Sequence, residues 1–483
     1  MENSLVLSLI DFLHPQQWQI VQQAATIAAQ SNLRLFAVGG IVRDALLANP
    51  AFRDHELPTQ AAISTTKYQC ISDIDLVVDG APCAGILVAT ELHKYYRQSK
   101  LKNHDKFQTA ELNFAAATLD AIANVTSIDW DFTIDLATAR QEIYAYEGAN
   151  PEVQHTTIER DLYRRDFTIN ALAVQILPSG LPTPIIDQFN GLADLKRGLL
   201  RPIRAGSFAE DPRRIYRAVR FAVRLNLNMI PAMAAEIKNT IDTGHFDNLG
   251  GSRLRAEIIY NLQEKPLCKA SQIWHKLQEL GALRCIHPDL KLSPEFTKNL
   301  RLLAWLMKQM PLMCQGNAKV ANYNFAELGL TLLCSYLHDL ALQEMHLSLN
   351  HEQQNAARAM QKYQLVATNL MNYLINNGLQ DFRQIKPSFV CGQFLHCYEW
   401  ELILWFCRGS KLMRQIIWRY LSQWQFVKSP LNGKDLQELG YPADKNLGKI
   451  LGQLRNLYLD QVIDSPQSAR LWLNEQRREL SNL

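Results

Sequence analysis

The feature that most limits how this 483-residue chain can fold is a glycine pair between an apolar run and a helical pattern, in "LRLFAVGGIVRDALL". The apolar run before Gly39 predicts a buried strand, Gly39 and Gly40 predict a tight turn, and residues 41–48 predict the start of a helix. Glycine lets backbone amides approach a triphosphate closely, the helix N-terminus favours negative charge, and Arg43 adds a candidate charge-assisted hydrogen bond. The segment therefore predicts a phosphate-binding turn.

Two aspartates follow on one predicted strand, Asp73 and Asp75 in "SDIDLVV". Residues i and i+2 of a strand face the same side, so both carboxylates can converge on one site and hold Mg²⁺. Asp135, in the second strand-like run "TIDLATARQEIY", is a candidate third carboxylate. Two metal ions held there would lower the pKa of a 3′-hydroxyl, align it with an α-phosphate and neutralise the leaving pyrophosphate. The competing interpretation is a solvated strand end beside an ordinary turn.

Six motifs in a fixed order extend this pattern over residues 33–225: "GGIVRD", "DID", "DLATAR", "RRDFTINALA", "DQFNGLADLKRGLLRPI" and "AEDPRRIYRAVRFA". With them the chain resembles the class II tRNA nucleotidyltransferase and poly(A) polymerase family. The resemblance implies an α+β fold, with a polymerase-beta-like nucleotidyltransferase head of mixed sheet and helices, followed by an all-α neck, body and tail. The expected parts are the catalytic head at residues 1–175, the neck at 176–265 for reading the base and binding RNA, the helical body at 266–375 and the tRNA-binding helical tail at 376–483.

The resemblance also implies roles for individual residues. Asp73 and Asp75 would bind the metal ions, with Asp135 as the supporting carboxylate. The nucleotide's ribose and phosphates would be bound by Arg165, Asp166 and Asn170, and its base would be read by Asp211 and Arg214.

Base reading by Asp211 and Arg214 also has a physical basis. Three residues apart on a helix, they would lie on one face and offer a carboxylate acceptor beside a guanidinium donor. Cytosine and adenine both present an amino donor next to a ring acceptor, so one pair fits both bases. Uracil and guanine would leave both groups unpaired, at roughly 1–3 kcal/mol per missing bond. The alternative is that Asp211 only favours a helix start and Arg214 is solvated.

Global charge is nearly balanced, with 50 lysines and arginines against 47 aspartates and glutamates, but local charge is not. Nine basic residues lie between Lys196 and Arg224. Arg213, Arg217, Arg220 and Arg224 recur at helical spacing, and the opposite face, with Ile215, Val219 and Val223, is expected to pack inward. The stripe predicts that Arg217, Arg220 and Arg224 contact RNA phosphates; a merely solvated basic face is the alternative.

Composition favours a cytoplasmic enzyme without a membrane partner. The nine cysteines form no C-x-x-C pair, which favours reduced thiols; no stretch approaches a membrane span, and the N-terminus does not read as a signal peptide.

Residues 49–70 form a polar loop that is longer than the resemblance leads one to expect. His338-Asp339, with His346 and His351 nearby, is similar to a His–Asp phosphohydrolase motif, but the spacing is incomplete and we expect no such activity.

The favoured function is template-independent addition of C, C and A from CTP and ATP to tRNA 3′ ends, with Mg²⁺ as cofactor. A partial CC- or A-adding enzyme is the first alternative, because the loop "YAYEGANPEVQHTTIERDL" lacks the arginine-rich form of many complete CCA adders. A poly(A) polymerase is less favoured, because its arginine-rich signature is missing from "YYRQSKLKNHDKFQTAELNF". A catalytically silent RNA-binding protein is disfavoured by the three carboxylates. Oligomeric state has no signal in the sequence.

Overall fold

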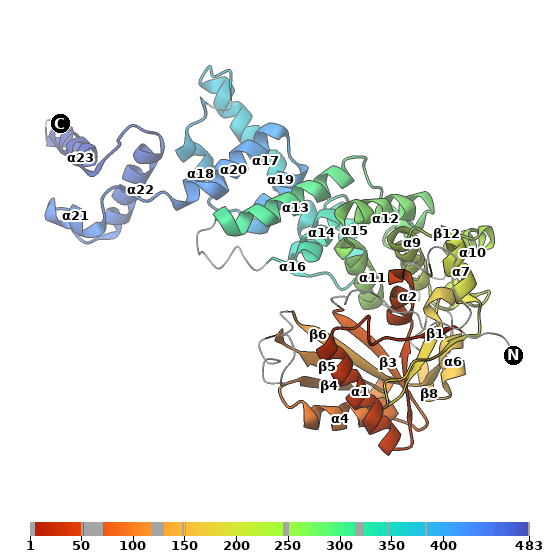
Figure 1. Cartoon of the computed structure of the whole chain (residues 1–483). Coiled ribbons are helices and arrows are strands. Elements are labelled where there is room, and N and C mark those ends of the chain that lie inside the picture. The colour runs from red at the N-terminus through yellow and green to blue at the C-terminus, as the bar shows by residue number, and fades with distance from the viewer. Residues whose placement is uncertain are drawn as a thin grey trace. The chain divides into compact units, whose positions relative to one another are not determined.

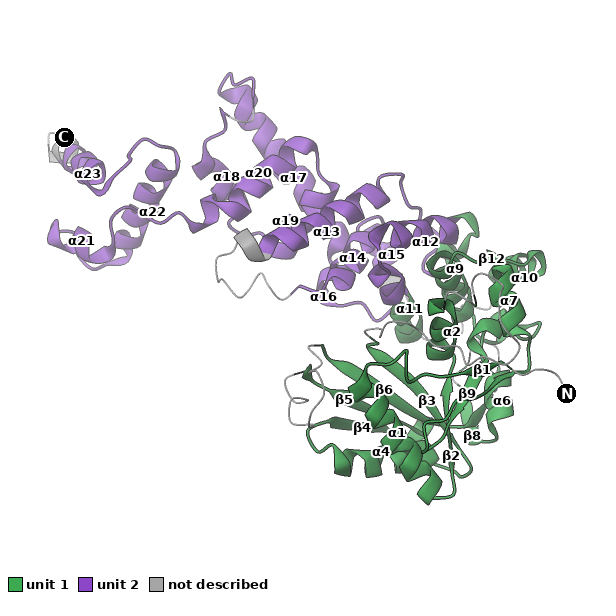
Figure 2. Ribbon diagram, in the orientation of Figure 1, with its two compact units in different colours: residues 1–257, 279–285 green, residues 258–278, 286–483 purple. Residues whose placement is uncertain are grey.

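The computed structural model describes residues 5–49, 52, 71–116, 130–146, 149, 151–244, 251–313, 323–344, 347–381 and 384–481. The chain forms two compact units (Figure 2). Unit 1 comprises Met1–Glu257 and Glu279–Cys285, and unit 2 comprises Ile258–Gln278 and Ile286–Leu483. The finer division into head, neck, body and tail stays a prediction.

An eight-stranded mixed sheet is the centre of unit 1 (Figure 1). Its order is β1 (Val6–Leu7), β10 (Thr183–Asp187), β9 (Leu172–Ile176), β2 (Arg34–Val38), β3 (Asp73–Asp79), β6 (Phe132–Thr138), β5 (Thr109–Phe114) and β4 (Lys100–His104). β3 and β6 run parallel, and every other neighbouring pair runs antiparallel. The predicted mixed sheet is confirmed, and it continues past residue 175 through β10.

Helices cover this sheet because their apolar residues recur at helical spacing. α1 (Pro15–Gln30) begins with proline in its first turn, where no backbone donor is lost, and buries Trp18, Val21 and Ala25. α4 (Ala84–Tyr95) lies against β6 so closely that a Cβ on Gly85 would be 2.7 Å from the backbone of Ala137. The remaining elements of this region are α2 (Gly40–Ala48), η1 (Asp105–Phe107), β7 (Arg140–Ile143), β8 (Glu152–His155), α6 (Ile158–Tyr163) and η2 (Thr168–Asn170).

The rest of unit 1 is mostly helical. It contains α7 (Gly191–Arg197), α8 (Ser207–Glu210), α9 (Arg213–Leu225), α10 (Pro231–Asp242), the start of α11 (Gly251–Gln263) and η3 (Ala282–Cys285). The expectation of an all-α neck at residues 176–265 was wrong in two places, because β10 lies there as part of the main sheet and a small second sheet follows. β11 (Leu199–Leu200) pairs in parallel with β12 (Asn228–Met229), since the chain returns beside itself after α9.

Unit 2 contains helices and no strand among its described residues, which confirms the helical second part. Its helices are α12 (Leu267–Glu279), α13 (Phe296–Met313), α14 (Phe325–Cys334), α15 (Asp339–Glu344), α16 (His351–Gln354), α17 (Ala356–Asn376), α18 (Pro387–Phe394), α19 (Glu399–Arg408), α20 (Lys411–Ser422), η6 (Trp424–Phe426), α21 (Gly433–Glu438), α22 (Lys445–Leu459) and α23 (Pro466–Ser481). The indole of fully buried Trp405 donates to the carbonyl of Ala359 at 2.8 Å, so α19 is fixed to α17.

Two chain-wide features complete the fold. Among the described residues, no helix has the length and apolar character needed to cross a bilayer. Seven cysteines are free thiols; Cys70 and Cys314 lie outside the described residues.

Candidate active site

A row of carboxylates crosses the middle of the sheet. The parallel pairing of β3 with β6 sets Asp75 directly beside Asp135. Asp73 and Asp75 are exposed while Ile74 between them is buried, so both aspartates face the same side, as predicted. On the other side of Asp135, β5 contributes Glu111, which the sequence analysis did not identify.

The negative charge of this row of carboxylates is not fully neutralised by the cationic groups around it. Desolvation raises the pKa of Asp75; Arg165 opposes the rise, and the charge of Asp73 adds to it. For Asp135, desolvation and then the charges of Asp75, Glu111 and Asp73 raise the pKa to about 7. Like charges this close are stable only when a proton or a cation joins them. The row is therefore suited to binding a cation.

The donor set fits Mg²⁺ with a nucleotide rather than a closed protein cage. Within the described residues, no group of three or more His, Cys, Asp and Glu side chains is arranged to hold a metal ion alone. Mg²⁺ commonly takes only one or two carboxylates, and waters and substrate phosphates complete its octahedron. Asp73 and Asp75 would supply these carboxylates. Carboxylate oxygens are hard donors, which suits the binding of Mg²⁺ together with a nucleotide.

The predicted glycine turn lies next to the row. Gly39 has φ +69°, and its amide donates to the carbonyl of Leu172 at 2.9 Å. A Cβ at this position would be 2.9 Å from Nη1 of Arg165 and 3.3 Å from the carbonyl oxygen of Asn170. The backbone conformation thus favours glycine, and an added Cβ would also displace the end of the Arg165 side chain. The predicted helix is confirmed as α2, which begins at Gly40, one residue earlier than predicted.

Arg43 lies inside the protein, which differs from the expected phosphate contact. Only 2% of it is exposed. Its Nε donates to Oδ1 of Asp44 at 2.8 Å, and its Nη1 donates to Oδ1 of Asn170. In this arrangement Arg43 orients Asn170, and a direct contact with phosphate would require it to leave these partners.

Asp166 and Asn170 form one hydrogen-bonded pair. Oδ1 of Asp166 accepts from Nδ2 of Asn170 at 3.1 Å, and Oδ2 accepts from Nε of Arg217 at 2.7 Å. Burial alone would raise the pKa of Asp166, but Arg217, the bond from Asn170 and the charge of Arg214 lower it to about 2. Asp166 is therefore ionised at any physiological pH and fixes Arg217.

The predicted arginine stripe is mostly engaged within the protein. The helix itself is confirmed as α9, with Ile215 and Val219 fully buried. However, Arg217 and Arg220 lie 3.7 and 3.1 Å from the carboxylate of Glu257 on α11. The sequence did not reveal this because Glu257 lies far along the chain.

Two other arginines of the stripe differ from each other. Arg213 pairs with Asp211 at 2.7 Å, whereas Arg224 has an exposed side chain. Val223, expected to pack inward, is only half-buried. RNA contact by Arg217, Arg220 and Arg224 stays a prediction, and Arg224 has the exposure that such contact needs.

Asp211 and Arg214 do not share a helical face, so this expectation was wrong. Asp211 has extended backbone, φ −137° and ψ 91°, because the following Pro212 disfavours the helical region, and α9 begins only at Arg213. Its carboxylate is held by Arg213 at 2.7 Å and Arg253 at 3.5 Å. The role of Asp211 and Arg214 in base reading stays a prediction.

Arg214 has its own set of partners. Its Nη1 donates to Oγ of Ser207 at 2.6 Å and lies 3.3 Å from Glu210, and its Nη2 donates to the carbonyl of Arg164 at 3.0 Å. It is 4% exposed. The guanidinium is thus rigid before any nucleotide binds.

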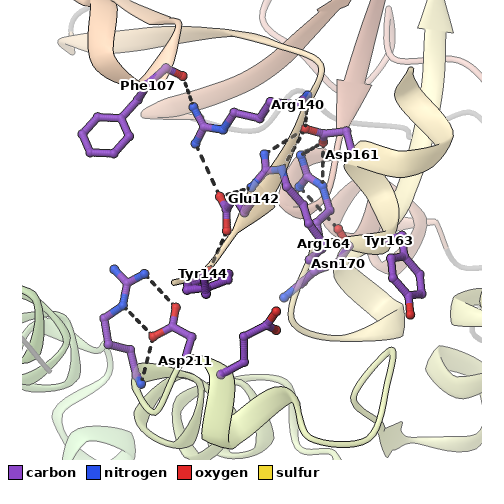
Figure 3. A network of polar contacts seen from close by, with 12 residues as sticks. Phe107, Arg140, Glu142, Tyr144, Asp161, Tyr163, Arg164, Asn170 and Asp211 are labelled. Atoms are coloured by element: carbon purple, nitrogen blue, oxygen red, sulfur yellow. Dashed lines mark hydrogen bonds and ion pairs between the residues drawn. The ribbon is translucent and has the colours of Figure 1, made fainter. Parts of the chain in front are cut away.

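A second polar network anchors the β7–β8 hairpin to α6 (Figure 3). Glu142 accepts from Arg164 Nη1 at 2.8 Å and from the hydroxyl of Tyr144 at 2.7 Å. Asp161, fully buried, pairs with Arg164 at 2.9 Å and with Arg165 at 3.2 Å. Asp161 thereby fixes the guanidinium that lies over Gly39. Neither acid was predicted, because in the sequence both look like ordinary surface residues.

Two other expectations remain open. Of the 49–70 loop, only Asn49 and Phe52 lie among the described residues. His338 Nε2 lies 3.4 Å from Asp289, while Asp339 pairs with Arg358 at 3.0 Å. His346 lies outside the described residues.

Known proteins share this architecture. Residues 35–201 match the family described as the poly A polymerase head domain. An A-adding tRNA nucleotidyltransferase of Geobacter sulfurreducens is 29% identical over 439 residues, which are 90% of this chain and 44% of that relative. The chain thus spans less than half the length of this curated relative.

Solved structures agree over nearly the whole chain. An apo form of a CCA-adding enzyme matches with a TM-score of 0.70 at 23% identity, covering 98% of each chain. The Thermotoga maritima CCA-adding enzyme complexed with tRNA matches with a TM-score of 0.66 at 23% identity, covering 97% of each chain. At this identity the likeness establishes the fold.

The carboxylate row and the glycine turn both lie within residues 35–201. The head-domain match thus confirms, for this part of the chain, the resemblance to the class II tRNA nucleotidyltransferase and poly(A) polymerase family. In that family such a head implies dependence on a divalent metal ion.

We predict that Gly39→Ala displaces Arg165 and strains the turn by about 1–3 kcal/mol. The KM for nucleotide should rise at least tenfold in single-nucleotide incorporation assays, because Arg165 is moved from the site. Gly448→Ala is the matched control: Gly448 lies in α22 with no neighbour within 4 Å of an added Cβ, so activity should not change. An unchanged KM in Gly39→Ala would show that the turn does not position the nucleotide.

We predict that Asp135→Asn stabilises the metal-free protein at high pH. With a folded pKa of about 7, above the usual value of about 3.9, ionisation of Asp135 costs stability as pH rises between these values. Wild type and variant should have the same melting temperature near pH 4, and the variant should have a melting temperature a few degrees higher than wild type at pH 8. Calorimetry measures this difference, with surface Glu91→Gln as control. A lower melting temperature for Asp135→Asn at pH 8 would contradict the assigned repulsion.

Proposed function

We propose that the protein is a template-independent tRNA nucleotidyltransferase that adds C and A from CTP and ATP to tRNA 3′ ends with Mg²⁺. The observation that carries the proposal is the pairing of Asp75 with Asp135 beside Asp73, next to the Gly39 turn. Three carboxylates with two raised pKa values favour an active enzyme over a silent RNA-binding protein.

The residues around the row have distinct tasks in this proposal. Mg²⁺ held by Asp73 and Asp75 would acidify the RNA 3′-hydroxyl and neutralise the triphosphate. Arg165, fixed by Asp161, lies at the Gly39 turn and adds positive charge for the phosphates. Asp166 and Asn170, already paired to each other, would hold the ribose. Asp211 and Arg214 would present their remaining hydrogen-bonding positions to the base.

Addition of A alone is the second candidate. Three curated relatives, from Geobacter sulfurreducens, Aquifex aeolicus and Halalkalibacterium halodurans, are named A-adding tRNA nucleotidyltransferases. The loop after β7 also lacks the arginine-rich form expected of many complete CCA adders. The two candidates share one site and differ in the nucleotides accepted. We assign either activity to the cytoplasm, where tRNA ends are processed.

The test is incorporation into tRNAs that end before CCA, before CA or before A, each with a single labelled nucleotide. Full CCA addition predicts C on the first two substrates and A on the third; A addition predicts label only from ATP on the third. No incorporation on any substrate would refute the proposal. Long A tails on every substrate would instead indicate a poly(A) polymerase.

The same assay identifies the catalytic residues. Asp73→Asn and Asp75→Asn should each lower incorporation at least a thousandfold, because metal positioning is lost, while the Kd for tRNA changes less than threefold. Glu91→Gln, on α4 beside Lys94, is the control for losing one carboxylate of this unit. Near-normal turnover of either aspartate variant would contradict the proposed metal site.

A further inference from the structure

A cavity of roughly 290 Å³ lies in unit 2, bordered by η6 and by α18, α20 and the end of α22, and these three helices are labelled in Figure 1. Its volume is near the lower end of ligand sites, which run from about 300 Å³ upwards. It is built wholly from unit 2 and shares no residue with the carboxylate row.

The walls of this cavity are fastened to one another. Asp460, just after α22, accepts from the amide of Ser388 at 2.9 Å and from its hydroxyl at 2.5 Å, so α18 is held to α22. Arg455 of α22 donates to the carbonyls of Val427 at 2.8 Å and Trp424 at 3.1 Å, so η6 is held as well. The cavity is therefore preformed, and binding would require little ordering.

Its lining is apolar at the base. Val390, Ile416 and Leu459 are buried there, and half-buried Trp424 adds an aromatic surface. Such a surface accepts a flat ring by stacking or by apolar contact.

Positive charge lies at the same cavity. Lys386 and Arg419 both line it and have exposed side chains. Neither side chain has a hydrogen bond or ion pair within the part of the chain that the structure describes. Asp460, the one carboxylate among the described lining residues, is already engaged by Ser388. The cavity thus combines two available cations with an aromatic wall.

We propose that this cavity binds one unpaired nucleotide of the RNA substrate, with its base against Trp424 and the apolar floor and its phosphate at Lys386 and Arg419. The inference rests on the proposed function, because the nucleotide comes from tRNA. An aromatic wall with a cation for the adjacent phosphate is the general chemistry of single-stranded RNA binding.

The first test is a filter-binding salt series with tRNA. In Lys386→Gln/Arg419→Gln, the slope of log K against log salt should fall by about 0.7 for each phosphate that is no longer neutralised. Lys298→Gln/Lys308→Gln is the matched control, since both lysines are exposed on α13 outside the cavity. An equal change of slope in both double variants would overturn the proposal, because it would indicate only a general electrostatic attraction of RNA to the protein surface.

The second test separates stacking from charge. Trp424→Leu should weaken tRNA binding about 5- to 100-fold without changing the salt slope, and Trp424→Phe should recover much of the loss. Unchanged affinity in Trp424→Leu would overturn the proposal. The melting temperature of each variant is measured alongside, and the lysine–arginine variant serves if Trp424→Leu does not fold.

The third test identifies the source of the nucleotide. The tryptophan fluorescence of Trp424→Phe is subtracted from that of wild type to isolate the signal of Trp424. This difference should change when tRNA is added and should stay constant with free CTP or ATP. A change with free nucleotide alone would assign the cavity to mononucleotides and overturn the RNA assignment. Wild type that neither binds nor extends tRNA would refute the proposed function as well. If wild type binds and extends tRNA and the variants equal it in tRNA binding, only the proposed role of the cavity is refuted.

Discussion

The repulsion between Asp75 and Asp135 is the constraint on which the rest of unit 1 depends. Parallel backbone pairing fixes Asp75 and Asp135 at neighbouring positions of the sheet, so their carboxylates start from adjacent backbone positions on one face. The repulsion is relieved by a proton or by positive charge brought to the site. The protein supplies part of that charge with arginine, and the remainder fits a metal ion with its nucleotide.

The arginines near the row are held by buried acids rather than left mobile. Asp161 holds Arg165, Asp166 holds Arg217, and Glu257 holds Arg220. Removing one member of such a buried pair leaves an uncompensated charge, which typically costs about 3–5 kcal/mol. The ring of Phe221 adds to this order, because the guanidiniums of Arg43, Arg217 and Arg220 lie 5.2, 5.5 and 5.7 Å from its centroid. The cationic groups are thus preorganised before substrate arrives.

The sequence predicted what depends on local spacing. The strand, glycine turn and helix around Gly39 follow from residues that are neighbours in the chain, and so does the shared face of Asp73 and Asp75. Glu111 and Glu257 were missed because their positions follow from strand pairing and helix packing between distant segments. Asp211 was misplaced for a local reason, since Pro212 disfavours helical backbone at the residue before it. The burial of Arg43 against Asn170 was not predicted, because these two residues are brought close only by the fold.

Uptake of Mn²⁺, as a stand-in for Mg²⁺, tests the central claim most directly. Electron paramagnetic resonance of free Mn²⁺ is followed while wild type or Asp75→Asn is titrated in the presence of CTP. The carboxylate row predicts that wild type with CTP removes Mn²⁺ from solution and that Asp75→Asn binds it at least tenfold more weakly. Equal Mn²⁺ uptake by the two proteins would contradict the assignment of this row as the metal site.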